Sequence, residues 1–198
     1  MAGPLPSENN AVPRDGPGMT EPAMAHDVLI RPASRADLAA ITRIYDQAVR
    51  EGTASFELTP PDADEMMLRY ESLQDGGYPY LVADLGGTIG GYAYAGPYRA
   101  RPAYRWSVED SVYVDTTAHR RGLGRALLAR LLSDSEARGF RQMIAVIGDS
   151  ANAASIELHR ALGFRMVGTL DNVGFKFGRW LDSVLMQRPL GDGANSAP

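Results

Sequence analysis

Cysteine is absent from the 198 residues, which excludes disulfides, thiolate metal sites, iron–sulfur clusters and a cysteine nucleophile. Histidine is scarce: His26, His119 and His159 stand far apart and lack the one-turn spacing of a helical metal site, so we expect no metal. Lysine occurs only as Lys176, so arginine carries nearly all the positive charge. An arginine cluster is therefore weak evidence for an anion site in this chain.

Long apolar runs are also missing, and none approaches the roughly 20 residues of a membrane span. The N-terminus lacks the basic-then-apolar layout of a signal peptide, so we expect a cytoplasmic protein with no membrane contact. The net charge of -4 offers no general attraction for nucleic acid, which we exclude as a partner. The expected partner is a small molecule.

The chain length suits one domain with unstructured ends. Residues 1–26 are rich in proline and poor in bulky apolar side chains, so we expect a disordered N-terminal tail. Met19 and Met24 precede the first apolar run, and translation from either is a further hypothesis. The expected domain covers residues 27–190, and residues 191–198 form an expected flexible C-terminal tail.

From residue 27 onward, strand-like and amphipathic helix-like segments alternate, which predicts a sheet covered by helices. One expected helix follows Ser34 and another runs from near Asp62 to Gly76, while two more cover 122–139 and 152–162. The expected strands cover residues 27–32, 79–85, 88–95, 108–115, 141–147, 164–170 and 181–188.

The stretch VYVDTTAHRRGLGRALL, residues 112–128, places a short basic loop between a strand and a helix that opens with glycine. Backbone N–H groups at a helix start lack partners within the helix and lie at the positive end of its dipole, which suits a pyrophosphate. Gly122 and Gly124 permit close approach, and nearby arginines can add charge. A helix start capped by solvent is the plain alternative.

Three other motifs are excluded. The P-loop pattern G-x-x-x-x-G-K-[ST] does not occur, and a Rossmann G-x-G-x-x-G would need a third glycine where Leu127 stands. The GDS at 148–150 follows a strand, as the nucleophile does in one family of esterases. No later Asp-x-x-His accompanies it, so a hydrolase is rejected.

A second motif, N-x-x-S-x-x-L-x-x-x-x-G-F, comprises Asn152, Ser155, Leu158, Gly163 and Phe164. Together with the glycine turn it resembles the GNAT superfamily of acyl-CoA-dependent N-acetyltransferases over about residues 27–190. The resemblance implies an α/β fold of the α+β type. Its sheet would be mixed and mostly antiparallel, with six or seven strands, helices on both faces, and a splay at the central strand ending in Asp115.

A closer resemblance is to the phosphinothricin and methionine sulfoximine N-acetyltransferases. It rests on long matching segments at 56–61, 94–106, 108–114, 145–164 and 173–187. Members of this group acetylate the α-amino group of small amino-acid analogues and usually form dimers. The resemblance therefore implies a small-molecule amine substrate, acetyl-CoA as co-substrate, and a homodimer.

The resemblance also assigns the cofactor site. The pantetheine arm would pair with Val112, Tyr113 and Val114 like an added strand, and Asn152 and Ser155 are carried over from the second motif. His119 stands where the family usually has arginine or glutamine, which leaves the role of its side chain open. The pyrophosphate would rest on His119, Arg120, Arg121, Gly122, Leu123, Gly124 and Arg125.

Acyl transfer to an amine needs a neutral nitrogen, although an α-amino group is mostly protonated at pH 7. Glu109, at the start of the central strand, is the candidate base, with a surface carboxylate beside Asp110 as the alternative. Val114 or a neighbour can offer a backbone N–H to the oxyanion. His159 stands where many GNAT members have tyrosine; it is a candidate proton donor or substrate ligand, with a packed core histidine as the alternative.

A zwitterionic substrate needs a cation for its carboxylate, and Arg99 and Arg105 are the candidates. Phe56 and Tyr104 are candidates for the pocket wall. Two alternatives stay open: acetylation of another amine, such as a polyamine, an aminoglycoside or a protein N-terminus, and a non-catalytic acyl-CoA sensor. The arginines around Glu109 favour an acidic or zwitterionic amine.

Overall fold

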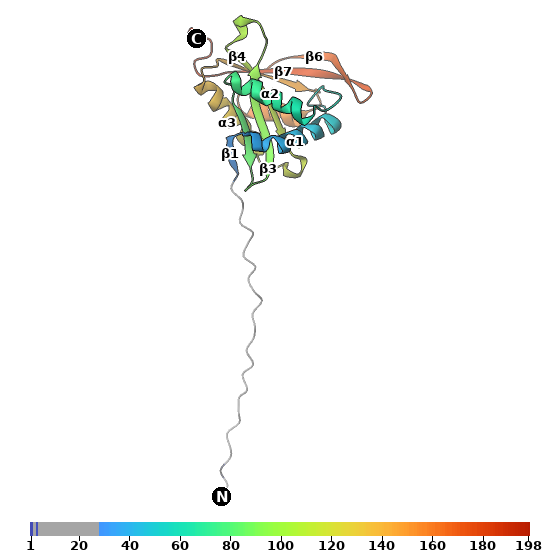
Figure 1. The fold of residues 1–198 in the computed structure, drawn as a ribbon, viewed down its shortest axis with the longest axis vertical. Coiled ribbons are helices and arrows are strands. Elements are labelled where there is room, and N and C mark those ends of the chain that lie inside the picture. Colours follow the sequence, from blue (N-terminus) through green and yellow to red (C-terminus); the bar gives the residue numbers. More distant parts are fainter. Residues whose placement is uncertain (2, 4–27) are drawn as a thin grey trace.

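The computed structural model describes Met1, Gly3 and residues 28–198. Across residues 28–198, seven strands form one sheet in the order β1-β2-β3-β4-β5-β7-β6 (Figure 1). All neighbouring strands are antiparallel except β4 and β5, which are parallel. The predicted mixed sheet is therefore confirmed, whereas the predicted tail with Met19 and Met24 lies outside the described residues.

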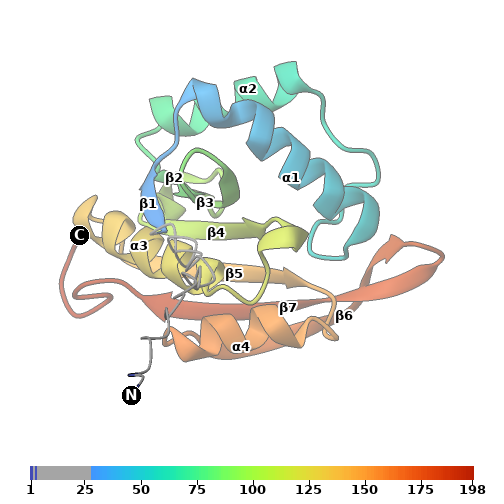
Figure 2. The same cartoon turned by 90° about the horizontal axis from the view of Figure 1, so that it is seen from below.

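The helices cover both faces of the sheet. Figure 2 shows α1 and α2 on one face and α3 and α4 on the other. None of the helices in residues 28–198 is long and apolar enough to cross a membrane. The strands are β1 (Leu29–Pro32), β2 (Tyr80–Asp84), β3 (Ile89–Pro97), β4 (Ser107–Val114), β5 (Gln142–Gly148), β6 (Arg165–Lys176) and β7 (Arg179–Pro189), and the helices are α1 (Leu38–Glu51), α2 (Ala63–Asp75), α3 (Leu123–Ala137) and α4 (Ala153–Ala161).

Each face of the sheet has its own apolar core. On one side the α1 stripe packs with α2 and a group of tyrosines from β2 and β3. On the other, the leucines of α3 pack mainly on β2, β3 and β4, in a core that extends to residues of β5 and β7. Full burial of one such side chain contributes about 1.5–3 kcal/mol, so these stripes hold the helices on the sheet. The buried stripes are Leu38, Ile41, Ile44, Tyr45 and Val49 on α1, and Leu123, Leu127, Leu128, Leu131 and Leu132 on α3, as predicted.

The pairing of β4 with β5 is short. It joins Ser107–Asp110 to Gln142–Ala145 and then stops. Beyond that point β4 continues along β3 as far as Val114, while β5 continues along β7 as far as Gly148. The two central strands therefore diverge, and each keeps its outer partner.

The C-terminal hairpin is longer than the sequence predicts. The expected strands at 164–170 and 181–188 were wrong in extent, because β6 and β7 continue to a tight turn at Phe177 and Gly178. The turn residues are Phe and Gly rather than the Asn-Gly pair that marks such turns in a sequence. Phe177 has a φ of 51°, which is uncommon for an aromatic residue. Most of β6 is exposed, which also removes the inside–outside alternation used to recognise a strand.

A buried carboxylate holds the turn that leads into α1. Asp37 accepts hydrogen bonds from the Arg31 guanidinium and from Ser34, and the Arg31 contact lowers the pKa of Asp37 to about 2. Because this pKa lies below its unfolded value, the stabilisation is present above pH 4 and is lost as the pH falls toward 2. We expect it to amount to about 2 kcal/mol.

Asp37→Asn should therefore lower the free energy of unfolding at pH 7 by about 2 kcal/mol, measured by urea denaturation, and should flatten its decline between pH 5 and pH 2. Asp46→Asn is the control, because Asp46 forms an exposed pair with Arg50 and should change stability by less than about 0.5 kcal/mol. Equal effects of the two substitutions would contradict the assignment.

Candidate active site

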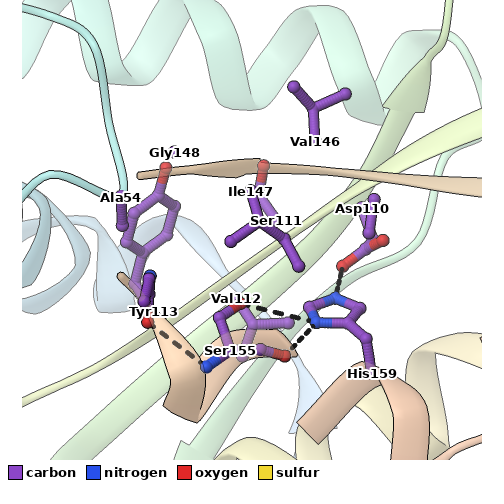
Figure 3. Close-up of a pocket in the computed structure, with 12 residues that line it drawn as sticks. Ala54, Asp110, Ser111, Val112, Tyr113, Val146, Ile147, Gly148, Ser155 and His159 are labelled. Carbon is purple, nitrogen blue, oxygen red and sulfur yellow. Dashed lines mark hydrogen bonds and ion pairs between the residues drawn. The ribbon is translucent and has the colours of Figure 1, made fainter. Parts of the chain in front are cut away.

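A cleft that is partly open to solvent lies where β4 and β5 diverge (Figure 3). Its walls come from both strands, from the start of α4 and from the loop after α1. Backbone edges of β4 beyond Asp110 and of β5 beyond Ala145 face this gap, because each strand is paired only on its outer side. The lining residues are Ala54, Asp110, Ser111, Val112, Tyr113, Ala145, Val146, Ile147, Gly148, Asn152, Ser155 and His159.

The cleft passes through the sheet. Successive residues of a strand point to opposite faces. Val112 packs in the core beneath α3, whereas Tyr113 packs edge-on against Tyr45 of α1, with ring centroids 5.1 Å apart. Since residues of both sets line the cavity, it connects the α4 side with the α1 side. Two molecules entering from opposite faces can therefore meet between the strands.

The start of α3 provides backbone donors. Gly122 caps the helix with a left-handed φ of 77°, and the first intrahelical bond runs from Ala126 N to Gly122 O. In the part of the chain that the structure describes, the N–H groups of residues 123–125 have no acceptor. These groups, with the helix dipole, lie where the sequence predicts an anion site.

Side chains around this loop divide into two groups. Arg120, Arg121 and Arg125 are exposed and form no ion pair with any residue in the described region, so their charges are available to an anion. His119 instead donates from Nε2 to the Val114 carbonyl at 3.1 Å, which ties the loop to the end of β4. Leu123 is buried, so only its backbone faces the site.

Asp110 and His159 form a buried pair on the α4 side of the cleft. His159 is 4% exposed and lies 2.9 Å from Asp110 through Nε2 and Oδ2. Its Nδ1 lies 2.7 Å from the Ser155 carbonyl, in the turn that Asn152 caps. Burial lowers the pKa of His159, but the hydrogen bond and charge of Asp110, with the Ser155 carbonyl, raise it above its usual value.

Glu109 lies on the opposite face of β4 from Asp110. Burial raises the pKa of the Glu109 carboxyl to about 7, the charge of Asp110 adds to this rise, and the Arg99 guanidinium opposes it. No hydrogen bond or ion pair holds the carboxylate among residues 28–198. Glu109 is thus a half-buried carboxyl that exchanges a proton near neutral pH.

The predicted acceptor residues do not all gather. The guanidinium of Arg99 lies over the rings of Tyr98 and Tyr104, at 5.1 and 6.0 Å, close enough to act on Glu109. Arg105 instead lies over its neighbour Trp106. Arg99 and Tyr104 therefore lie together, and Arg99 lies close enough to Glu109 to act on its pKa.

Phe56 borders the cleft from the loop after α1. A Cβ atom at Gly148 or at Gly174 would overlap the Phe56 ring, so these two glycines form the slot that holds it. The neighbouring Ser55 carbonyl accepts a hydrogen bond from the buried Lys176 ammonium at 2.7 Å. The wall of the cleft is thereby attached to the β6–β7 hairpin.

Sequence reasoning missed several lining residues, above all Asp110 and Ser111. Strand alternation could have placed Asp110 opposite Glu109, but its partner His159 lies 49 positions away. Ala54, Ile147 and Gly148 carry no chemical signal of their own. Among residues 28–198 no group of three or more histidine or acidic side chains is arranged to hold a metal ion.

Comparisons with known proteins agree on one family. The model of the acetyltransferase (GNAT) domain matches residues 30–185. The chain is 54% identical over 162 residues to the phosphinothricin N-acetyltransferase of Alcaligenes faecalis, covering 82% of each protein. It is 44% identical over 165 residues to the L-methionine sulfoximine/L-methionine sulfone acetyltransferase of Salmonella typhimurium, covering 83% of this chain and 96% of that protein.

A solved structure gives the same result. The crystal structure of a GNAT superfamily phosphinothricin acetyltransferase from Sinorhizobium meliloti, in complex with acetyl-CoA, matches with a TM-score of 0.84 and 50% identity. The match covers 86% of this chain and 92% of that one.

The environment of Glu109 leads to a direct prediction. Its carboxyl should titrate near pH 7. Carbon-13 NMR of glutamate-labelled protein would follow this titration, and the missing signal in Glu109→Gln would assign it. Arg99→Gln should raise this pKa further, because it removes the charge that opposes burial. Arg101→Gln, an exposed neighbour, serves as the control, and equal shifts in both variants would contradict the role of Arg99.

Proposed function

The chain belongs to the GNAT family of acetyltransferases, and on this premise we propose that it acetylates the α-amino group of a small amino-acid analogue of the phosphinothricin or methionine sulfoximine type. It is an acetyl-CoA-dependent N-acetyltransferase. The observation that carries the finer proposal is the cleft through the sheet, with a proton-accepting carboxyl on the face opposite the anion site. Acetylation would block the free amine of such a toxic analogue. Because the reaction consumes acetyl-CoA, we propose a cytoplasmic location.

The residues present fit acetyl-CoA. Free N–H groups of residues 123–125 and three exposed arginines suit its pyrophosphate, while the unpaired edge of Ser111–Val114 suits an extended arm that joins the strand. When bound, it supplies an activated acetyl thioester. His119 keeps the anion loop attached to β4 during this binding, which gives its side chain a positioning role.

Glu109 accepts the proton that the substrate ammonium must lose. Its pKa of about 7 is close to that of an α-amino group, so transfer is nearly balanced in energy. Glu109 lies on the face of β4 that packs with α1 and the tyrosines of β2 and β3, and Arg99 lies near it. The acetyl group then passes directly to the amine, with no covalent intermediate on the protein. Backbone N–H groups of the β4 edge, including that of Val114, are available to stabilise the oxyanion that forms.

Arg99 and the aromatic side chains select the amine. An exposed guanidinium beside the base suits the carboxylate of a zwitterion and repels a polyamine or an aminoglycoside. Tyr104 and Phe56 form the walls. Arg105, whose guanidinium lies over the Trp106 ring, is the second candidate for the acidic end of the substrate.

The substrate class is tested by release of the coenzyme A thiol from acetyl-CoA. We expect turnover with phosphinothricin and methionine sulfoximine and none with spermidine or an aminoglycoside, with free amino acids measured in parallel. Turnover with a cationic amine alone would move the assignment to that substrate class. Acetyl-CoA binding without any turnover would identify a sensor.

The base is tested by Glu109→Gln, which should lower kcat/KM at pH 8 by about 100-fold. In the wild type kcat/KM should rise with pH through about 7, since only the carboxylate accepts a proton, and this rise should vanish in the variant. Glu136→Gln, an exposed carboxyl on α3, is the matched control. An unchanged pH profile in Glu109→Gln would exclude Glu109 as the base.

We further propose a homodimer in which the β6–β7 hairpin of one copy meets that of a second copy. β6 is at the edge of the sheet, and much of the hairpin's large apolar surface is exposed. An exposed apolar edge strand that pairs with its own copy around a two-fold axis covers both edges at once. The exposed side chains are Met166, Val167, Leu170, Val173, Phe175, Phe177 and Trp180.

Light scattering after size exclusion should give a dimer mass for the wild type. Val173→Glu should give the monomer, because it places a charge in the centre of the apolar surface. Leu68→Glu is the control on an equally exposed leucine of α2 and should stay dimeric. A monomeric wild type would overturn the proposal.

A further inference from the structure

Lys176, the only lysine of the chain, is buried at the end of β6 with its ammonium against the loop that borders the cleft. We propose that Lys176 is a positioning residue of the acceptor site. By holding the Ser55 carbonyl, it fixes the two adjacent residues, Ala54 and Phe56, where a small zwitterionic amine needs them. The inference rests on the acetyl transfer proposed above and adds to it a determinant of amine affinity.

The Lys176 ammonium makes a single hydrogen bond within the part of the chain that the structure describes. Nζ donates to the Ser55 carbonyl oxygen at 2.7 Å, and no backbone N–H of residues 28–198 reaches that oxygen. Nζ also lies 5.0 Å from the centroid of the Phe177 ring, which attracts a cation. Lys176 therefore satisfies the carbonyl of a buried residue, and a side chain without a donor would leave it without a partner.

Ser55 stands between the two residues through which the loop reaches the cleft. Ala54 lines the cleft, and the Phe56 ring lies in the slot formed by Gly148 and Gly174. Ser55 is itself 7% exposed, so it is enclosed by its surroundings. A bond to its carbonyl acts on both neighbours, because a planar peptide joins each of them to Ser55.

Two further contacts hold the loop, one from each helix on this face. From α1, the Tyr45 hydroxyl lies 3.0 Å from Ser55 Oγ, which also accepts a hydrogen bond from the Glu57 N–H at 3.2 Å. From α2, Arg69 pairs with the Glu57 carboxylate at 2.6 Å. Across residues 28–198, the Lys176 bond alone reaches the main chain of residues 53–57 from β6 or β7.

This position is unfavourable for an ammonium. Lys176 is 3% exposed, and burial lowers its pKa against the opposing charge of Glu57, which is itself paired with Arg69. A methionine of similar length would avoid the cost of burying a charge. Stability alone therefore does not account for a lysine here, whereas a requirement on the placement of the loop does.

The loop borders the cleft on the side where the amine would enter. Tyr45, which contacts Ser55, packs edge-on against Tyr113 with ring centroids 5.1 Å apart. Tyr113 and Glu109 are four residues apart on β4, so they face the same side of the sheet. The start of α3, where the pyrophosphate would bind, lies on the other face (Figure 2). A displaced loop should therefore weaken amine binding and leave acetyl-CoA binding unchanged.

Lys176→Met tests the positioning role. We expect the KM for the amine to rise about tenfold, with kcat changed less than threefold and the KM for acetyl-CoA less than twofold. Lys176→Arg keeps a donor and should stay within about threefold of the wild-type amine KM. Arg165→Met is the matched control, because Arg165 is an exposed cation of the same strand that binds Gln187. An unchanged amine KM in Lys176→Met, an equal rise in both KM values, or no rescue by arginine would overturn the inference.

Gly174→Ala reaches the same loop without altering Lys176. The added methyl group would lie 2.5 Å from the Phe56 ring, so the ring must move out of its slot. We expect the same selective rise in the amine KM, and little further rise when Lys176→Met is added, because both changes act through the loop. Independent, multiplying losses would contradict a shared route.

Nitrogen-15 NMR of lysine-labelled protein observes the ammonium directly, since the chain has one lysine. We expect its signal to shift when methionine sulfoximine is added to the complex with coenzyme A, and to stay in place when coenzyme A is added alone. An unshifted signal at a saturating concentration of an amine that the protein acetylates would count against the inference.

The kinetic measurements separate the inference from the proposed function. An active wild type together with a normal amine KM in Lys176→Met would overturn the inference and leave the proposed function intact. Absence of turnover with every amine in the wild type would overturn the proposed function, and the inference with it, before any variant is compared.

Discussion

The early end of the β4–β5 pairing is the constraint on which the rest of the site depends. Only Ser107–Asp110 and Gln142–Ala145 pair, and the strands then separate. A gap in a sheet leaves backbone groups without partners, which is unfavourable unless something holds the strands apart. Here β3 and β7 do so, because each continues its full antiparallel ladder along the outer edge of its neighbour. The gap is thus built into the sheet, and its free edges are ready to bind an extended ligand.

Strand geometry then distributes the chemistry. Glu109 and Asp110 are adjacent, so they must face opposite sides of the sheet, and their environments differ accordingly. Glu109 is half-buried without a partner, and burial raises its pKa to about 7. Asp110 is buried against the imidazole of His159, whose Nε2 lies 2.9 Å from its Oδ2 atom. Two neighbouring carboxyls thereby acquire separate environments, and the separation comes from the pleat rather than from any difference in residue type.

The β6–β7 hairpin and the wall of the cleft are in direct contact. Lys176 of β6 donates to the Ser55 carbonyl, and the Phe56 ring lies against Gly148 of β5 and Gly174 of β6. Burial lowers the pKa of Lys176, but the carbonyl satisfies its ammonium. The loop that borders the cleft therefore packs directly on the β6–β7 hairpin.

Local patterns in the sequence determined much of this protein. The apolar stripes of α1 and α3, the start of α2 near Asp62 and the glycine-led start of α3 depend on neighbours within one or two turns, and all were predicted correctly. Glu109 was also identified as a candidate base from its place on the central strand. Such features can be read from the chain because the atoms that stabilise them are close in sequence.

Only the tertiary structure decided which distant residues meet. The pairing of Asp110 with His159 spans 49 positions, and that of Lys176 with Ser55 spans 121. The full length of the β6–β7 hairpin likewise had no local signal. Hydrophobic periodicity shows which face of an element is buried, but it does not show what that face is buried against. That choice depends on sheet order and on where the β4–β5 pairing ends.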